Sequence, residues 1–410
     1  MKKEYIPLLL LAAAIALSPS FSAGTLPDGK IIEIRIEDIL IVVLGLVWIA
    51  SFLVSGKKTV EKPPLLFPIL AWLGIGFFSV LTNWIFGNLE LSRGFFYFLK
   101  EIEFFFLYFY LFYHIKSIDS AKFIIKIWIF LGLINIGWIV YQTITGLELT
   151  YYYGPTAFME PGGPFPSSGF FLILFIFLFN ILLFYYWNLN ISKFKKGFLG
   201  VMVMVPGVGA LISGSRTSFW GLLFALFFTF LLGFLRKKNF RVFLASILLI
   251  ILLSVSFIYF VPTWPGAKRA LDIKGVLWEY GREAGPTRIN IFKALLEVVS
   301  KHPLNIFFGF GVVGEAHSQY MRNLIERGII GSLVFFCLIF IIIKKSWQGF
   351  SKNKDAFSIS LSAGLLIATL TMLLMSIPTD PFMVVKVAEV YWFFVALTMA
   401  TLSFKLKESN

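Results

Sequence analysis

The chain alternates between long apolar segments and short polar ones. The apolar segments are continuous, and each approaches the roughly 20 residues that a helix needs to cross the hydrocarbon layer of a bilayer. Strands of a transmembrane β-barrel would instead alternate apolar and polar side chains, so that class is excluded. The pattern predicts an all-α polytopic membrane protein with about 12 transmembrane helices, near residues 6–23, 38–54, 64–86, 95–114, 121–145, 167–187, 198–214, 217–235, 242–262, 328–344, 356–377 and 385–404.

The first apolar segment has two interpretations. Lys2 and Lys3, an apolar core from Leu8 to Leu17 and small residues around Ala23 fit a secretory signal peptide as well as a first helix. We favour an uncleaved helix. Both interpretations deliver the chain to the outside before the second span, so the later topology is the same.

Basic residues recur in every second loop between the predicted spans. Only 14% of the residues are charged and 58% are hydrophobic, which no soluble domain of this size would combine. The net charge of +14 lies in these short loops, so it encodes membrane topology and does not indicate nucleic-acid binding. The positive-inside rule makes this side cytoplasmic and places both termini there. Its basic residues are Lys2, Lys3, Lys57, Lys58, Lys62, Lys116, Lys122, Lys193, Lys195, Lys196, Arg236, Lys237, Lys238, Arg241, Lys344, Lys345, Lys352, Lys354, Lys405 and Lys407.

One long segment, residues 263–327, remains on the outer, periplasmic side. It divides the chain into nine transmembrane helices at 1–262, a large periplasmic loop at 263–327, and three further spans with a cytoplasmic tail at 328–410. The loop is expected to be helical in part. An apolar stripe at i, i+3, i+4 spacing predicts an amphipathic helix after Pro286.

A second short helix is expected from near Glu315 to Arg327, with Gly328 leading into the tenth span. His317 lies at the start of that helix, where water and lipid head groups meet. A neutral imidazole there can accept a proton from a sugar hydroxyl. The competing interpretation is an ordinary surface histidine. Ser318, Gln319 and Arg322, which follow on the same helix, are expected to contact substrate.

Two arginines are the other candidates for a catalytic role. Arg216 lies in a tight outer hairpin between two apolar spans, where a charge near the hydrocarbon indicates function or snorkelling to the interface. Arg288 begins the amphipathic helix of the large loop, and a structural salt bridge is its alternative. Guanidinium groups bind phosphate oxygens through forked, charge-assisted hydrogen bonds, so two of them near a histidine suggest a diphosphate leaving group.

The fourth span carries further charges. Arg93 and Lys100 are seven residues apart and share a helix face, so they are candidates to extend the anion site. A pair between Lys100 and Glu103 is the competing interpretation. The outer loops contain no Asp-x-Asp pair and no His/Cys cluster, so the sequence indicates no catalytic metal and no cofactor.

Several of these stretches resemble the O-antigen ligase and polymerase superfamily of bacterial membrane glycosyltransferases. The most specific is His317-Ser318, nine residues, then Gly328-Ile329-Ile330-Gly331. The other stretches occur in the family's order: Ile36-Glu37-Asp38-Ile39-Leu40, Ser213-Gly214-Ser215-Arg216-Thr217, Arg288-Ile289-Asn290-Ile291-Phe292, His302-Pro303 and Gly309-Phe310-Gly311.

The resemblance implies a helical core similar to the GT-C type and an active site that faces the periplasm of a bacterial inner membrane. It implies transfer of a glycan from an undecaprenyl-diphosphate donor, without a metal and with inversion at the anomeric carbon. His317 would be the base that activates the acceptor hydroxyl, and Arg216 and Arg288 would hold the diphosphate. Besides this donor, the expected partners are membrane lipids and a lipid A–core or other glycan acceptor; nucleic acid is not expected.

The branch of the superfamily is less well defined. The spacing from His317 to Gly331 favours an O-antigen ligase, which moves a finished chain onto lipid A–core. A polymerase that joins lipid-linked repeat units, or a protein glycosyltransferase, shares the same core motif. A lipid-linked glycan transporter without catalytic activity is the alternative from another class. A transporter would be expected to place charges along a path through several spans.

Overall fold

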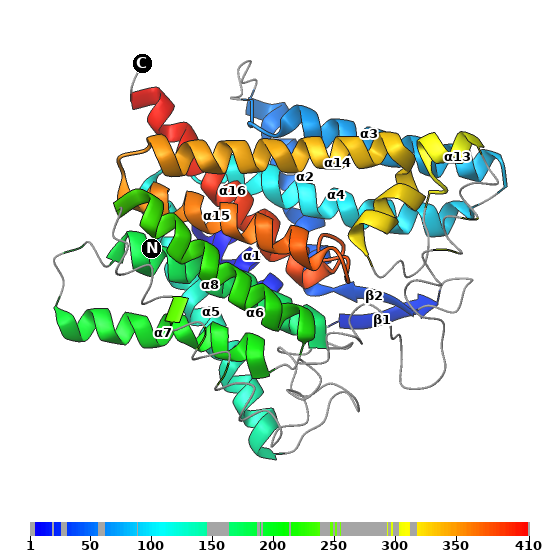
Figure 1. Cartoon of the computed structure of the whole chain (residues 1–410). Helices are drawn as coiled ribbons and strands as arrows, with labels where there is room; N and C mark the ends of the chain where they lie inside the picture. Colours follow the sequence, from blue (N-terminus) through cyan, green and yellow to red (C-terminus); the bar gives the residue numbers. More distant parts are fainter. Residues whose placement is uncertain are drawn as a thin grey trace.

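The computed structural model is a bundle of helices that run roughly along one common direction (Figure 1). It describes residues 5–18, 20–25, 31–55, 62–87, 89–145, 164–186, 192–212, 215–237, 303–311 and 318–408, and the single positions 189, 247, 248, 251, 255, 293 and 297. The helices within these residues are α1 (Ile6–Leu17), α2 (Ile36–Ser55), α3 (Leu66–Ile85), α4 (Leu91–His114), α5 (Ile118–Thr145), α6 (Pro164–Phe184), α7 (Lys193–Ile212), α8 (Arg216–Lys237), α13 (Pro303–Phe308), α14 (Gln319–Lys352), α15 (Ala356–Met375) and α16 (Val385–Glu408).

Helices occupy the predicted transmembrane positions wherever the structure describes them. Seven described helices are long and apolar enough to cross a membrane, namely α3, α5, α7, α8, α14, α15 and α16. Two shorter apolar helices lie in α1 and α6, and α2 and α4 coincide with the second and fourth predicted spans. The ninth predicted span, 242–262, and the amphipathic helix after Pro286 lie largely outside the described residues. The protein is therefore a multi-pass membrane protein, with seven of the expected spans supported by length and apolar character.

The prediction of an all-α fold missed a short β-hairpin. Strand β1 (Ser20–Thr25) pairs antiparallel with β2 (Ile31–Arg35), with Ser20 opposite Arg35 and Phe21 opposite Ile34. The sequence of β2 alternates β-branched and charged residues with a period of two, which suits a strand and not a helix. The hairpin joins α1 to α2 and lies at the end of the bundle opposite the start of α1 (Figure 1).

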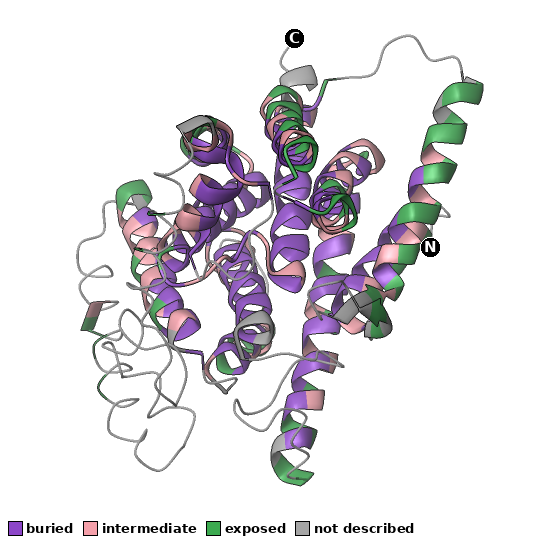
Figure 2. Cartoon of the chain, turned by 90° about the vertical axis from the view of Figure 1, so that its right-hand side faces the viewer, coloured by how far each residue is buried: buried purple, intermediate pink, exposed green. Residues whose placement is uncertain are grey.

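The centre of the bundle is formed by α15 and α16. In α15 83% of the spanning window is buried, and in α16 89%, whereas the figure for α14 is 33%. Helices α6, α8 and α14 pack around α15, and α4 and α6 pack on α16. Figure 2 shows buried residues on the inner faces of the helices and exposed ones on the outer faces.

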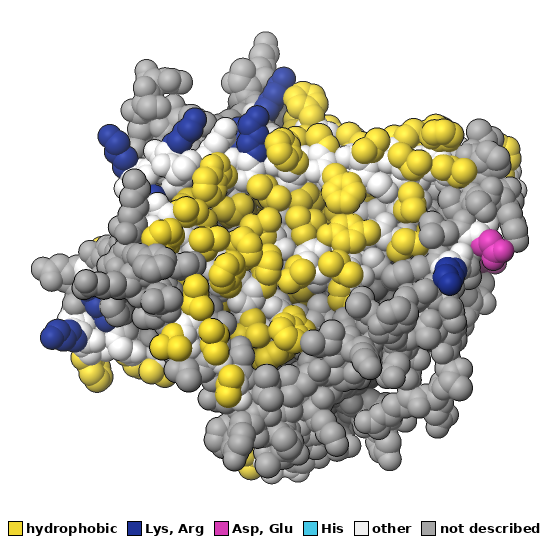
Figure 3. Space-filling view, viewed as in Figure 1, with side chains coloured by type: hydrophobic (Ala, Val, Ile, Leu, Met, Phe, Trp, Pro, Cys, Tyr) yellow, Lys and Arg dark blue, Asp and Glu magenta, His cyan; other side chains and the backbone are white. Residues whose placement is uncertain are grey.

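The outer faces of the bundle are apolar. On α14, for example, Leu333 and Phe340 are 64% and 62% exposed. Figure 3 shows hydrophobic side chains over the broad middle of one face, with most of the visible Lys and Arg toward the end at which α14 finishes and α7 begins. Such a continuous apolar surface is unfavourable in water and matches a lipid environment. The basic end carries exposed Lys193, Lys344 and Lys352, which the sequence assigns to the cytoplasm.

Helix α14 is broken near its start. Gly328 has φ 65° and ψ −166°, so the segment Gln319–Arg327 and the long helix after it are separate helices joined at a kink. This backbone region is accessible to glycine almost alone. A Cβ at Gly328 would also lie 2.2 Å from the carbonyl oxygen of Phe307.

Gly309, which follows α13, makes the reciprocal contact. Its φ is 76°, and a Cβ there would lie 2.2 Å from the backbone nitrogen of Arg327. The backbones of residues 307–309 and 326–328 are therefore in direct contact. The predicted short helix that ends at Arg327 and the entry to the tenth span at Gly328 are confirmed, with the helix beginning at Gln319.

Hydrogen bonds from α3 and the 309–311 turn occupy backbone groups next to this break. The amides of Phe310 and Gly311 donate to the carbonyls of Ile325 and Glu326, at 2.7 and 3.0 Å. From α3, the Ser79 hydroxyl donates to the Glu326 carbonyl at 2.7 Å, and the Asn83 amide donates to the Gly309 carbonyl at 2.9 Å. Backbone groups that a helix break leaves unpaired are costly in a membrane, so these bonds stabilise the kink.

We expect Gly328→Ala to destabilise the protein by about 2 kcal/mol or more, because alanine would have to adopt a glycine-only conformation and would collide with the backbone at Phe307. Thermal unfolding of the purified protein in detergent measures this effect. Gly74→Ala in α3 is the matched control, since a Cβ there meets nothing within 4 Å and alanine favours helix. Equal unfolding temperatures for Gly328→Ala and the unsubstituted protein would contradict the assigned role of the kink.

Candidate functional site

The start of α14 is fixed to the link between α15 and α16. Ser318, the N-cap residue, donates from its hydroxyl to the Ser376 carbonyl at 3.1 Å. The backbone nitrogen of Gln319 donates to the carbonyls of Ser376 and Thr379, at 3.1 and 2.9 Å. Both Ser318 and Gln319 are buried. The two residues directly after His317 are therefore held by three hydrogen bonds to the α15–α16 link.

Arg322, one turn into α14, lies between two carboxylates. Its Nη2 atom is 2.8 Å from Asp380 Oδ2 in the α15–α16 link, and its Nη1 atom is 3.6 Å from Glu326 Oε1 on its own helix. The Arg322 side chain is 11% exposed and that of Asp380 23%. The ion pair thus adds a partly buried, charged contact to the hydrogen bonds that attach α14 to this link.

Arg327 is enclosed between α14, α3 and α4. Its Nη2 atom pairs with Glu101 on α4, and its Nη1 atom donates to the Trp72 carbonyl on α3 at 3.1 Å. The guanidinium carbon lies 3.7 Å from the centre of the Trp72 ring, a cation–π distance. A Cβ at Gly76 would come within 2.8 Å of Nη2, so the close approach of α3 needs a glycine there.

The two glycines of the Gly-x-x-Gly stretch therefore have separate tasks. Gly328 forms the kink. Gly331, one turn later, faces Arg327, where a Cβ would lie 2.2 Å from that of the arginine. Together they allow the chain to turn while the Arg327 side chain enters the bundle.

A small cavity connects these groups. It has room for about one water molecule and is lined in part by Tyr97, Glu101, Arg322, Glu326 and Arg327. The carboxylates of Glu101, Glu326 and Asp380 face the guanidinium groups of Arg322 and Arg327 across this region. With three carboxylates to two guanidinium groups, the arrangement has no excess positive charge. It is suited to holding α14 in place, and an anion would have to compete with carboxylates for Arg322.

The structure describes only part of the predicted site. His317 and Arg288 lie outside the described residues. Arg216 is the first residue of α8, and its side chain is not described. Of the remaining predicted contacts, Ser318, Gln319 and Arg322 come together at the start of α14.

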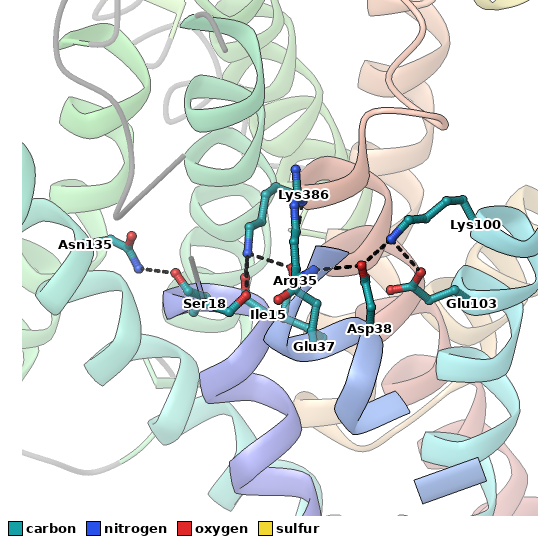
Figure 4. Close-up of polar contacts among 10 residues, drawn as sticks. Ile15, Ser18, Arg35, Glu37, Asp38, Lys100, Glu103, Asn135 and Lys386 are labelled. Atoms are coloured by element: carbon teal, nitrogen blue, oxygen red, sulfur yellow. Dashed lines mark hydrogen bonds and ion pairs between the residues drawn. The ribbon is translucent and has the colours of Figure 1, made fainter. Parts of the chain in front are cut away.

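Arg93 and Lys100 are elsewhere on α4. Arg93 is half-buried in the first turn. Lys100 lies against α2, with Nζ 2.6 Å from Asp38 Oδ2 and 3.2 Å from Glu103 Oε2 (Figure 4). The pair with Glu103 was the alternative to a role in anion binding, and it is present here together with a second carboxylate.

Sequence reasoning missed Arg327 and the carboxylates that pair with Arg322 and Arg327. Arg327, Glu101, Glu326 and Asp380 were not among the predicted site residues. A signal was available, since each is an ionisable residue in or beside an apolar span, where charges are rare and are retained for pairing or function.

Residues 199–336 match the protein-family model described as O-antigen ligase. The match begins in α7, includes α8, α13 and the start of α14, and contains Arg216, Arg288, His317 and Gly328. A comparison with curated proteins finds no match. The family's motif region and the kinked start of α14 therefore coincide, and this multi-pass membrane protein carries a segment that matches the O-antigen ligase model.

Proposed function

We propose that the protein is an extracytoplasmic glycosyltransferase that moves a glycan from an undecaprenyl-diphosphate donor to an acceptor hydroxyl. Lipid-linked glycan transfer is the chemistry of the O-antigen ligase family, whose domain the chain carries. The observation that supports an active site at the start of α14 is the anchoring of Ser318 and Gln319. The residue before them, His317, is the proton-active group of the family motif.

In this proposal His317 accepts the proton of the acceptor hydroxyl through a neutral ring nitrogen. The acceptor oxygen then attacks the anomeric carbon of the donor sugar, and the bond from that carbon to the diphosphate oxygen breaks. The electron pair of that bond leaves with undecaprenyl diphosphate, and the configuration at the anomeric carbon inverts. No metal is invoked, because Arg216 and Arg288 supply the positive charge that stabilises the leaving diphosphate.

Arg322 is best described as a positioning residue. Its pair with Asp380 at 2.8 Å, together with the bonds from Ser318 and Gln319, holds the start of α14 against the α15–α16 link. General-base catalysis needs the base within hydrogen-bond reach of its proton, so small shifts of this helix would reduce the rate. Arg93, Lys100 and Gln319 remain predicted substrate contacts.

The most specific form of the proposal is an O-antigen ligase acting at the periplasmic face of a bacterial inner membrane, with both termini in the cytoplasm. The polymerase and the protein glycosyltransferase remain alternatives, since the acceptor is chosen outside the shared motif. A transporter is less well supported. The matched family model is described as an O-antigen ligase and not as a transporter, and the buried charges Glu101, Arg322 and Arg327 are paired with neighbouring groups.

We expect His317→Ala to lower the transfer rate by about 10²–10⁴-fold, because the general base is removed. The measurement is glycan transfer by the purified protein with a lipid-diphosphate glycan donor and an acceptor. His114→Ala is the matched control: His114 stacks on Tyr110 at 4.0 Å near the far end of α4 and should leave the rate unchanged. Full activity of His317→Ala would refute the proposed mechanism.

Asp380→Asn separates a positioning role of Arg322 from a direct role in anion binding. If Arg322 positions α14, the loss of its closest carboxylate should lower kcat by about tenfold with little change in KM for the donor. If Arg322 instead binds the donor diphosphate, removal of its competitor should lower KM. Steady-state kinetics over a range of donor concentrations measures both constants. Asp119→Asn, which alters an exposed carboxylate, is the control.

Deletion of the gene tests the ligase assignment. A ligase-deficient cell should have lipid A–core without O-antigen, while long chains accumulate on the carrier lipid. Gel electrophoresis of lipopolysaccharide, with chromatography of the carrier-linked glycans, measures both pools. A core that carries a single repeat unit would identify a polymerase instead.

A further inference from the structure

A second cluster of buried charges lies where β2 leads into α2, beside α4 and α16. It contains three carboxylates, Glu37, Asp38 and Glu389, close to Lys100 and Lys386. Figure 4 labels Glu37, Asp38 and the two lysines. Glu37 and Glu389 have no exposed surface. The cluster is separate from Arg322 and Asp380, and the proposed reaction uses none of its three carboxylates.

Each of the two lysines contacts only one of the two oxygens of the α2 carboxylate beside it. Lys386 Nζ is 3.1 Å from Glu37 Oε1, and it also donates to the Ile15 carbonyl at the end of α1, at 2.6 Å. Lys100 Nζ is 2.6 Å from Asp38 Oδ2, and the Arg35 amide donates to that same oxygen at 2.9 Å. All of these bonds to the two carboxylates involve Oε1 of Glu37 or Oδ2 of Asp38.

The opposite oxygens are buried and have no hydrogen-bond donor among the described residues. These are Glu37 Oε2, Asp38 Oδ1 and both carboxylate oxygens of Glu389. A carboxylate oxygen is an acceptor only, and a buried acceptor without a donor is strongly unfavourable. The neighbouring Glu103 offers Asp38 another carboxyl group, which donates only if it carries a proton. Neither carboxylate oxygen of Glu389 has a hydrogen-bond partner within the part of the chain that the structure describes.

One oxygen from each of Glu37, Asp38 and Glu389 lies within 4.8 Å of the other two. An ion at the centre of such a triangle lies about 2.8 Å or less from each oxygen, close to the roughly 2.3–2.6 Å bonds of a hard cation with oxygen ligands. The nearby formal charges are four carboxylates, counting Glu103, against Lys100, Lys386 and the Arg35 guanidinium. With all four carboxylates ionised, one negative charge is left over, which one monovalent cation balances.

We propose that Glu37, Asp38 and Glu389 form a binding site for a small monovalent cation of the size of Na⁺. The bound ion joins α2 to α16. Helix α16 begins just after Asp380, and Lys386 also contacts the end of α1. The site therefore fixes the outer ends of α1, α2 and α16 to one another, independently of the function proposed for the O-antigen ligase domain.

The test is thermal unfolding of the purified protein in detergent, in NaCl or in choline chloride at the same total concentration. Equal ionic strength removes the general screening effect of salt. A ligand that binds the folded state alone raises the unfolding temperature with its concentration until the site is saturated. We expect a saturable rise of about 2–4 °C in NaCl, absent in Glu389→Gln and present in the control Asp119→Asn, whose carboxylate is exposed.

Binding of radioactive ²²Na⁺ to the immobilised protein gives a second readout, independent of stability. We expect one bound ion per chain in the unsubstituted protein and in Asp119→Asn, with loss of binding in Glu389→Gln. Two results would overturn the proposal. One is no bound ²²Na⁺ and equal unfolding temperatures in the two salts. The other is an unfolding temperature that falls as pH rises, equally in both salts, in the unsubstituted protein but not in Glu389→Gln. That result would mean that a proton, and not a metal ion, balances the charge of the cluster.

Discussion

The break in α14 at Gly328 is the constraint on which the outer end of the bundle depends. A helix cannot end inside an apolar environment unless other groups satisfy its backbone. Here that requirement brings together α13, α14 and α3, because Ser79 and the amides of Phe310 and Gly311 serve the carbonyls at the break. The two glycines of positive φ, at 309 and 328, make the necessary backbone contact possible.

The kink also explains how Arg322 and Arg327, five positions apart, reach different surroundings. The short helix before Gly328 directs Arg322 toward Asp380 in the α15–α16 link, while Arg327 enters the space between α3 and α4. Each finds a carboxylate on a different element. Burying such charges singly would be prohibitive, and pairing them makes the burial tolerable. Their value to the protein lies in fixing the relative positions of helices that apolar packing alone would leave free to slide.

Most of the helices could be predicted from the sequence. The hairpin and the long-range ion pairs could not, for physical reasons. Apolar segment length predicts the helices, and the Gly328 boundary follows from glycine at the entry to a span. The hairpin at residues 20–35 was hidden because its short alternation lies between two apolar runs. The distant partners of Arg322 and Lys100 were not predictable, since Asp380 and Asp38 lie 58 and 62 positions away along the chain. Periodicity reports which face of a helix is apolar and says nothing about which distant charge meets it. The roles of His317, Arg216 and Arg288 rest on the family motif.

The attachment of α13 has a consequence for how such proteins can diversify. Gly311 is bonded to α3 and α14, and Ser318 to the α15–α16 link, so only residues 312–317 lie between two fixed points. The longer stretch before Pro303 precedes both of these fixed points in the sequence. Away from Arg288, its length and sequence can therefore change without altering the register of the six-residue link that ends in His317. Under the proposed function, a change of acceptor can therefore arise in that stretch while the link to His317 keeps its length.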